Sequence, residues 1–243
     1  MRKFLFVASE VRSGSTYFSE NLAYRLENDF GFSFFDVTRE KFNTLCDSST
    51  AKDIADIADN LFLDISGWAA SKIMCGSLSV IMRECSRSND LKMKMFGEHA
   101  FWIVVRRKDK IKQAISLAFA RQSGIYHHYD TNNNDPDGEV ELESYELRSA
   151  LKAIEMSDQY LTVFSETLPK NRFVEIFYED FCENIDKTLE RIYNQMGFEF
   201  LPKSKNENLS KLLPTSVDKK VAYEDKFKEW FLENYHQIGD QSV

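Results

Sequence analysis

Hydrophobic and polar positions alternate along the chain in blocks that predict strands and helices in turn. Short apolar runs rich in Phe, Ile and Val are typical of strands covered on both faces of a sheet. Longer segments with apolar residues three or four positions apart are typical of amphipathic helices. Strands are expected at Phe4–Val7, Phe32–Val37, Trp68–Cys75, Phe101–Val105 and Arg172–Phe177.

Helical periodicity fills most of the chain between these strands. Helices are expected at Tyr17–Glu27, Ala51–Leu63, Leu78–Cys85, Lys110–Gln122, Leu142–Leu168, Tyr178–Met196 and Tyr223–Tyr235. The segment from Leu142 is either one long helix or two short ones, and residues 86–97 form a polar connection. Strands that alternate with helices predict an α/β fold with a mainly parallel sheet and helices on both faces.

The 243 residues contain no linker rich in Pro, Gly or Ser, so a single domain is expected over residues 1–243. Residues 129–139 are polar and turn-forming, which favours a flexible loop. Residues 221–236 form a C-terminal helical tail. Its Trp230, Phe231 and Tyr235 are expected to dock on the core, with a second subunit of a homo-oligomer as the alternative.

The first candidate site follows the first strand, in the run Arg12-Ser13-Gly14-Ser15-Thr16. An apolar strand precedes this run and a helix follows it, so the run lies at a helix N-terminus. Free backbone N–H groups and the helix dipole attract an anion there. Gly14 permits close backbone approach, and Arg12 adds a positive charge with fork geometry. The sequence therefore predicts a phosphate or sulfate site.

Two other readings of this loop exist. A Walker A loop needs G-x-x-x-x-G-K-[ST], and here no Lys stands between Gly14 and Ser15, which disfavours ATP hydrolysis. The other reading is that Ser13 and Ser15 only cap a helix.

A second candidate site follows the strand Phe101–Val105, which ends in Arg106-Arg107-Lys108-Asp109. Arg107 lies at the strand end and Ser116 about two helical turns further on, so both can reach one phosphate. The carboxyl ends of parallel strands meet at one edge of a sheet, so both loops open on the same crevice. The alternative is a solvated basic turn followed by a helix whose Ser116 and Gln113 face water.

Composition narrows the class of protein. A net charge of −8 and a pI near 5.2 argue against a nucleic-acid partner. The cysteines show no C-x-x-C spacing, which favours free thiols in a reducing cytosol over zinc or disulfides. The sequence shows no signal peptide and no run of membrane-spanning length, so a cytoplasmic protein without stable membrane insertion is expected.

The two motifs together resemble a known family. Four segments carry the resemblance, namely Arg12–Thr16, Arg107–Asp109, Gln113–Ser116 and Ala120–Gly124. In kind and order they are similar to motifs of the bacterial trehalose 2-sulfotransferase type of sulfotransferase. The resemblance runs from about Lys3 to the helix after Tyr178. It implies a P-loop-like, three-layer fold that binds 3′-phosphoadenosine-5′-phosphosulfate (PAPS). It also implies transfer of the sulfuryl group to a hydroxyl, often on a carbohydrate or a glycolipid-like acceptor.

The resemblance also implies roles for single residues. The loop Arg12–Thr16 would hold the 5′-phosphosulfate, and Arg107 with Ser116 would hold the 3′-phosphate. Glu40 matches the acidic base of the family, although the Gly and Pro of that motif are missing around it. Lys72 matches the Lys of a Gly-Lys-[IL]-Met strand. The alternatives are a surface carboxylate for Glu40 and a lysine snorkelling from a strand end for Lys72.

Sulfuryl transfer needs positive charge on the peripheral and leaving oxygens, which Arg12, Lys72 and the helix amides supply without a metal ion. Glu40 accepts the hydroxyl proton, with His99, His127 and His128 as rival bases.

The acceptor pocket is expected from residues 42–67 and 126–138, with Tyr126 as an aromatic wall. No specificity code is readable in either segment. Two other functions stay open, namely a non-catalytic nucleotide- or phosphate-binding protein of the same fold and a small-molecule kinase.

Overall fold

The computed structural model describes residues 3–30, 34–35, 68–124, 126, 141–200 and 222–232. The chain forms two compact units, of which the first comprises Met1–Lys108 and Ser157–Ser210. The second comprises Asp109–Met156 and Lys211–Val243. Helix α6, Ser144–Thr167, runs from the second unit into the first. The single domain expected over the whole chain stays a prediction.

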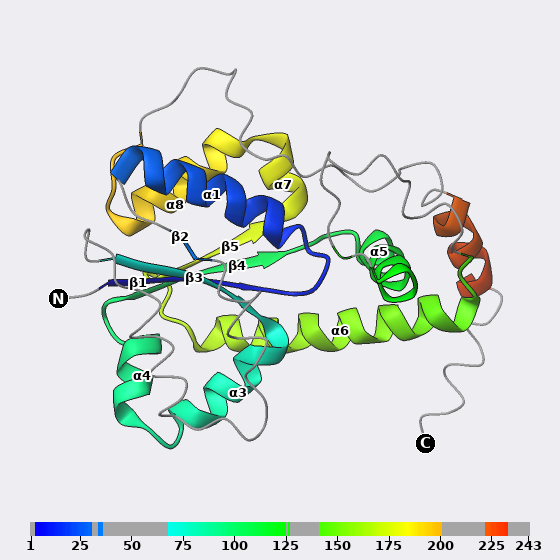
Figure 1. Ribbon diagram of the computed structural model, residues 1–243, viewed down its shortest axis with the longest axis horizontal. Coiled ribbons are helices and arrows are strands. Elements are labelled where there is room, and N and C mark those ends of the chain that lie inside the picture. The colour runs from blue at the N-terminus through cyan, green and yellow to red at the C-terminus, as the bar shows by residue number, and fades with distance from the viewer. Residues whose placement is uncertain are drawn as a thin grey trace. The chain divides into compact units, whose positions relative to one another are not determined.

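A five-stranded parallel sheet forms the centre of the first unit, in the order β2-β3-β1-β4-β5 (Figure 1). Its strands are β1 Lys3–Ser9, β2 Phe34–Phe35, β3 Trp68–Met74, β4 Ala100–Arg106 and β5 Phe173–Phe177. All five were expected from apolar runs. The register Ser9↔Met74 and Ser9↔Val105 aligns the carboxyl ends of β1, β3 and β4 at one edge.

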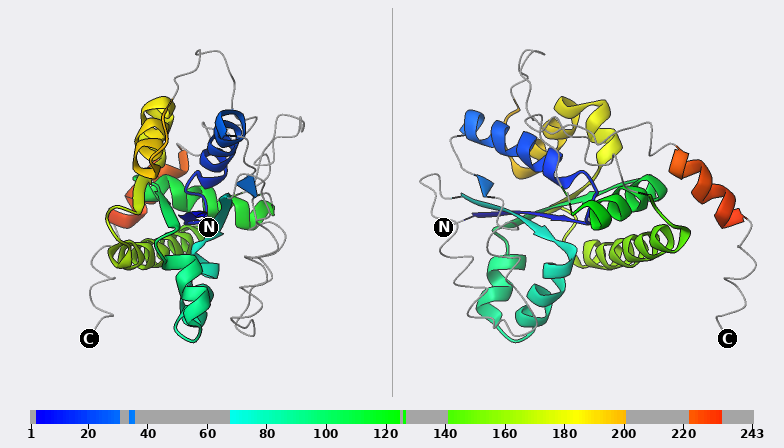
Figure 2. Two further views of the ribbon diagram at one scale, coloured as in Figure 1. Left: turned by 90° about the vertical axis from the view of Figure 1, so that its left-hand side faces the viewer. Right: turned by 45° about the vertical axis from the view of Figure 1, so that its right-hand side comes forward.

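Helices cover both faces of this sheet, as the sequence predicts (Figures 1 and 2). One face carries α1 Ser15–Phe30, α7 Tyr178–Glu183 and α8 Ile185–Met196; the other carries α3 Cys75–Cys85, α4 Asn89–Phe96 and the second half of α6. Side chains alternate between the two cores, so that Phe6 and Trp102 face the α3 side while Val7 and Ile103 face the α1 side. The α/β fold with a parallel sheet between two helical layers is confirmed.

Two helix predictions differ from the structure. Residues 86–97 contain α4, where the Ser88 hydroxyl accepts a hydrogen bond from Leu91 N and where Leu91 and Met95 are buried. Two buried residues four positions apart were too short a pattern to detect. The helix expected at 178–196 is split, because Asn184 ends α7 and its side chain caps α8 by accepting from Lys187 N at 3.0 Å.

The second unit is helical where it is described. It contains α5 Lys110–Ser123, the first half of α6 and a helix at 222–232. Their apolar residues form one cluster in which Phe119 lies edge-on to Tyr223, and Phe227 is buried. Trp230 packs against this cluster, whereas Tyr235 lies outside the described residues. Among the helices that the structure describes, none is long and apolar enough to cross a membrane.

Candidate functional site

The loop between β1 and α1 has the strand–loop–helix geometry predicted from the sequence. Helix α1 begins at Ser15, and its first turn closes where Phe18 N donates to Gly14 O at 3.0 Å. The preceding amides have no carbonyl partner within the helix, so they present N–H groups and the positive end of the dipole. The helix start is therefore suited to an anion.

Two residues in this loop have positive φ angles. Gly14 has φ 79°, and Arg12 has φ 57°, which is uncommon for a residue with a Cβ and stores strain. The Ser13 hydroxyl donates to the carbonyl of Glu10 at 2.9 Å and closes the turn. Turns of this kind gather successive N–H groups into a concavity that binds anions.

Tyr178, the first residue of α7, packs directly on the loop. A Cβ added to Gly14 would lie 2.0 Å from the ring carbon Cδ2 of Tyr178. The position therefore needs glycine both for its φ angle and for the close approach of the ring. Burial, together with a hydrogen bond to Cys182, raises the pKa of the Tyr178 hydroxyl, so this wall of the loop is neutral.

Lys72 brings a positive charge to the same loop from β3. Its side chain is almost fully buried, and Nζ donates to the Thr16 hydroxyl at 3.1 Å. Lys72 thus contacts the residue at which the first loop meets α1, and its role in sulfuryl transfer stays a prediction. An ammonium group beside a helix N-terminus makes the local field strongly positive.

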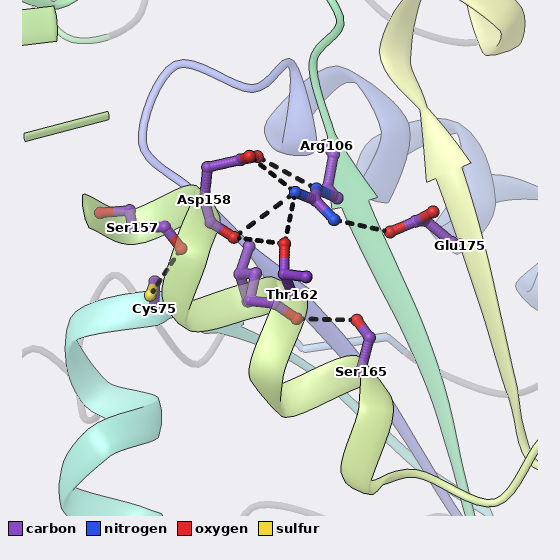
Figure 3. Close-up of polar contacts among 8 residues, drawn as sticks. Cys75, Arg106, Ser157, Asp158, Thr162, Ser165 and Glu175 are labelled. Carbon is purple, nitrogen blue, oxygen red and sulfur yellow. Dashed lines mark hydrogen bonds and ion pairs between the residues drawn. The ribbon is translucent and has the colours of Figure 1, made fainter. Parts of the chain in front are cut away.

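Three consecutive basic residues follow the core of β4, and the structure distinguishes them. The guanidinium of Arg106 is fully engaged: Nε and Nη2 bind the Asp158 carboxylate, Nη1 binds Glu175 at 3.0 Å and Nη2 also binds Thr162 (Figure 3). Burial lowers the pKa of Arg106, but these hydrogen bonds outweigh burial and raise it. Arg106 ties β4 to β5 and α6 and is structural.

Lys108 is engaged by α7. Its Nζ pairs with the Asp180 carboxylate, and its backbone N–H donates to Glu179. Lys108 is therefore neutralised by a neighbouring acid, as Arg106 is.

Arg107, between them, is less fully hydrogen-bonded than Arg106 within the described part of the chain. Its Nη1 donates to the backbone carbonyl of Arg12 at 3.3 Å, so the end of β4 and the first loop lie side by side. Its Nε is buried and makes no hydrogen bond within the described part of the chain, the nearest carboxylate oxygen being that of Glu179 at 3.7 Å. The guanidinium also lies over the Tyr178 ring, 5.5 Å from its centroid. Arg107 therefore differs from its two neighbours in having a guanidinium nitrogen that makes no hydrogen bond among the described residues.

Ser116 belongs to the second unit, in α5. It is buried together with Gln113 and Ala120, so these residues do not form the water-facing helix surface that the alternative reading required. Asp109 caps the helix by accepting from Lys112 N at 2.9 Å. The role of Ser116 at the 3′-phosphate stays a prediction.

The remaining predicted residues either lie outside the described part of the chain or contribute no described contact to the loop. Glu40, His127 and His128 lie outside the described residues. His99 directly precedes β4, and its carbonyl accepts from Phe4 N at 2.8 Å, at the amino end of the strands and opposite the loop. Tyr126 is exposed. Where the chain is described, His, Cys, Asp and Glu form no group of three or more that could hold a metal ion.

Sequence reasoning missed Tyr178 and Glu179 as part of this site. Both follow β5 directly, at the same edge of the sheet as the two predicted loops. That position was a signal, because every loop leaving a parallel strand at that edge is a candidate. From the sequence alone, the acidic residues at this helix start indicate only charges that the helix dipole favours.

The fold and the edge just described define an α/β protein with a strand–loop–helix junction at the carboxyl edge of a parallel sheet. A family model for Stf0 sulphotransferase matches residues 67–229, more than half of the 243-residue chain. The chain therefore belongs to the Stf0 sulphotransferase family and is a sulfotransferase, which confirms the family expected from its motifs. The matched segment contains Lys72, Arg107 and Ser116 and begins after the 12–16 loop.

Two solved structures are similar to the chain. The sulfotransferase domain from the curacin biosynthetic pathway is 15% identical over 83% of this chain and 76% of that chain, with a TM-score of 0.46. The sulfotransferase domain from the Synechococcus PCC 7002 olefin synthase is 14% identical over 94% of this chain and 96% of that chain, with a TM-score of 0.47. No curated protein matches the chain.

Proposed function

We propose that the chain transfers a sulfuryl group from PAPS to a hydroxyl of a carbohydrate or glycolipid-like acceptor. The observation that carries this proposal is the 3.3 Å hydrogen bond from Arg107 to the Arg12 carbonyl. It brings the end of β4 and the loop after β1 side by side, so that one ligand can contact both.

The residues present suit such a donor. The N–H groups at the start of α1 and the turn at Arg12 and Gly14 provide a cradle for the 5′-phosphosulfate. Arg107 retains guanidinium donors for the 3′-phosphate, and we assign Ser116 to the same phosphate from the motif alone. When bound, the donor supplies an activated sulfuryl group on a phosphate that can leave.

The chain's own residues would then act mainly by position and charge. Lys72 and the amides at the start of α1 hold positive charge where negative charge develops during transfer. Arg12 is our proposed third source of positive charge for the same phosphosulfate. Glu40 is our proposed base, which takes the proton from the acceptor hydroxyl.

The acceptor class and the cytoplasmic location also belong to this proposal. The carbohydrate acceptor rests on the family motifs, and trehalose itself is not assumed. The location is supported by the thiols of Cys75, Cys85 and Cys182, which are free in the described structure. We further propose that no metal ion takes part, because arginine, lysine and amide groups supply the charge.

A transfer assay with ³⁵S-labelled PAPS tests the proposal directly. Purified enzyme is incubated with a panel of mono- and disaccharides, glycolipids and hydroxylated lipids, with and without EDTA. We expect labelled product from at least one sugar-containing acceptor, undiminished by EDTA. Glu40→Gln should lower kcat while the donor KM is retained. Nucleotide binding without transfer to any acceptor, or Mg²⁺-dependent ATP turnover, would overturn the proposal.

A further inference from the structure

Glu179, the second residue of α7, contacts the end of β4 in two ways. Its carboxylate oxygens accept the backbone N–H of Lys108 at 3.2 and 3.0 Å. Its Oε1 also lies 3.7 Å from Nε of Arg107, with the two side chains 33% and 19% exposed. The Glu179 carboxylate therefore contacts both the backbone of Lys108 and the side chain of Arg107.

The Arg107 guanidinium is held from three directions within the first unit. The Arg12 carbonyl accepts from Nη1, the Tyr178 ring lies beneath Cζ, and Glu179 attracts the Nε side. The 3.7 Å separation from Glu179 is an ion pair and not a hydrogen bond, so the carboxylate orients the fork without saturating it. Among the described residues, none accepts from Nη2.

We infer that Glu179 is a positioning residue that holds Arg107 in the orientation in which its free donors meet the 3′-phosphate of the donor. This inference rests on the proposed function. An arginine that becomes ordered only when the ligand binds loses conformational entropy at that step, which weakens the affinity. An arginine that is already held in place loses less. The anchoring of Glu179 on the Lys108 amide fixes the carboxylate itself.

Electrostatic repulsion alone predicts the opposite effect of Glu179. A carboxylate near an anion site repels the ligand, so that removing it would strengthen binding. The chain offers a matched control for charge alone, because Asp180 is the next residue of α7 and pairs with the Lys108 ammonium. Among the described residues, no hydrogen bond or ion pair joins the Asp180 carboxylate to Arg107. Glu179 and Asp180 variants therefore separate orientation from net charge.

The first test measures donor KM and kcat, together with the Kd for adenosine 3′,5′-bisphosphate. Glu179→Ala should raise KM and Kd roughly three- to tenfold, the range expected for ordering one long side chain, with kcat nearly unchanged. Glu179→Gln keeps an oxygen for the Lys108 amide and should lie between Ala and wild type. Asp180→Asn should bind like wild type. Tighter binding by Glu179→Ala, or equal effects of Glu179→Ala and Asp180→Asn, would overturn the inference.

The second test needs no donor. Phenylglyoxal modification of Arg107 in the native enzyme is followed by peptide mass spectrometry. Glu179→Ala should raise the modification rate severalfold, while Asp180→Asn leaves it unchanged; an unchanged rate in Glu179→Ala overturns the inference. Should Glu179→Ala fail to fold, Glu179→Gln carries both tests. If Glu179→Ala raises the modification rate but the wild-type enzyme does not bind adenosine 3′,5′-bisphosphate, the result supports the positioning of Arg107 by Glu179 and rejects the proposed donor.

Discussion

Replacing Gly14 by Ala tests the packing of the anion loop against α7. The substitution places a Cβ 2.0 Å from Tyr178 Cδ2 and imposes φ 79° on a residue that disfavours it. The left-handed backbone costs about 1–2 kcal/mol, and forcing an atom into a packed site costs about 1–3 kcal/mol more. We therefore expect Gly14→Ala to lower the free energy of unfolding by about 2–5 kcal/mol.

Gly197 provides the matched control for this substitution. It has φ 78° at the end of α8, and a Cβ there meets no atom within 4 Å. Gly197→Ala should therefore cost only the backbone contribution of about 1–2 kcal/mol. Urea unfolding at constant m-value measures both variants.

The double variant Gly14→Ala/Tyr178→Ala isolates the steric part of the effect. In the double variant the ring that the new Cβ would meet is absent. The double variant should therefore lose less free energy of unfolding than the sum of the losses in the two single variants. Gly14→Ala should also weaken binding of adenosine 3′,5′-bisphosphate, whereas Gly197→Ala should not. Equal destabilisation by the two glycine variants, with no coupling to Tyr178, would refute the packing on which the site is built.

Three further predictions concern charge and thiol chemistry. Lys72→Met should lower kcat by about 10²–10³, because it removes a charge that stabilises the transition state; steady-state kinetics showing an unchanged kcat would count against its role. Arg106→Met should cost about 2–4 kcal/mol in urea unfolding by leaving its carboxylate partners unpaired, whereas Arg107→Met should leave stability nearly intact. Burial raises the pKa of Cys75 to about 11 and that of Cys85 to about 12. Only about one Cys75 thiol in a thousand is then ionised at about pH 8, so iodoacetamide should leave both thiols unmodified in the native enzyme until the pH approaches these values.

The sequence predicted the parts of this molecule that depend on local pattern. The strand Phe101–Val105 is covered by helices on both faces of the sheet. It is therefore apolar at every position, and such a run can be recognised in the sequence. The position of the loops followed from topology, since a loop that leaves a parallel strand opens at the carboxyl edge. That rule sufficed to predict that Arg12 and Arg107 lie close together.

What the sequence could not predict depends on contacts between distant residues. Arg106, Arg107 and Lys108 are alike in pattern, and only their partners from α6, β5 and α7 show that Arg107 keeps its donors. The need for glycine at position 14 likewise arises from the ring of Tyr178, 164 residues later in the chain. Such contacts are set by tertiary packing and leave no local periodicity.

The most direct test of the account compares two nucleotides on two proteins by calorimetric titration. Wild type should bind adenosine 3′,5′-bisphosphate at least about tenfold more tightly than adenosine 5′-monophosphate, because Arg107 contributes charge-assisted hydrogen bonds to the 3′-phosphate. Arg107→Met should lose most of that preference and keep its affinity for the monophosphate. If wild type binds the two nucleotides equally, or binds neither, the account of a two-phosphate donor site is contradicted.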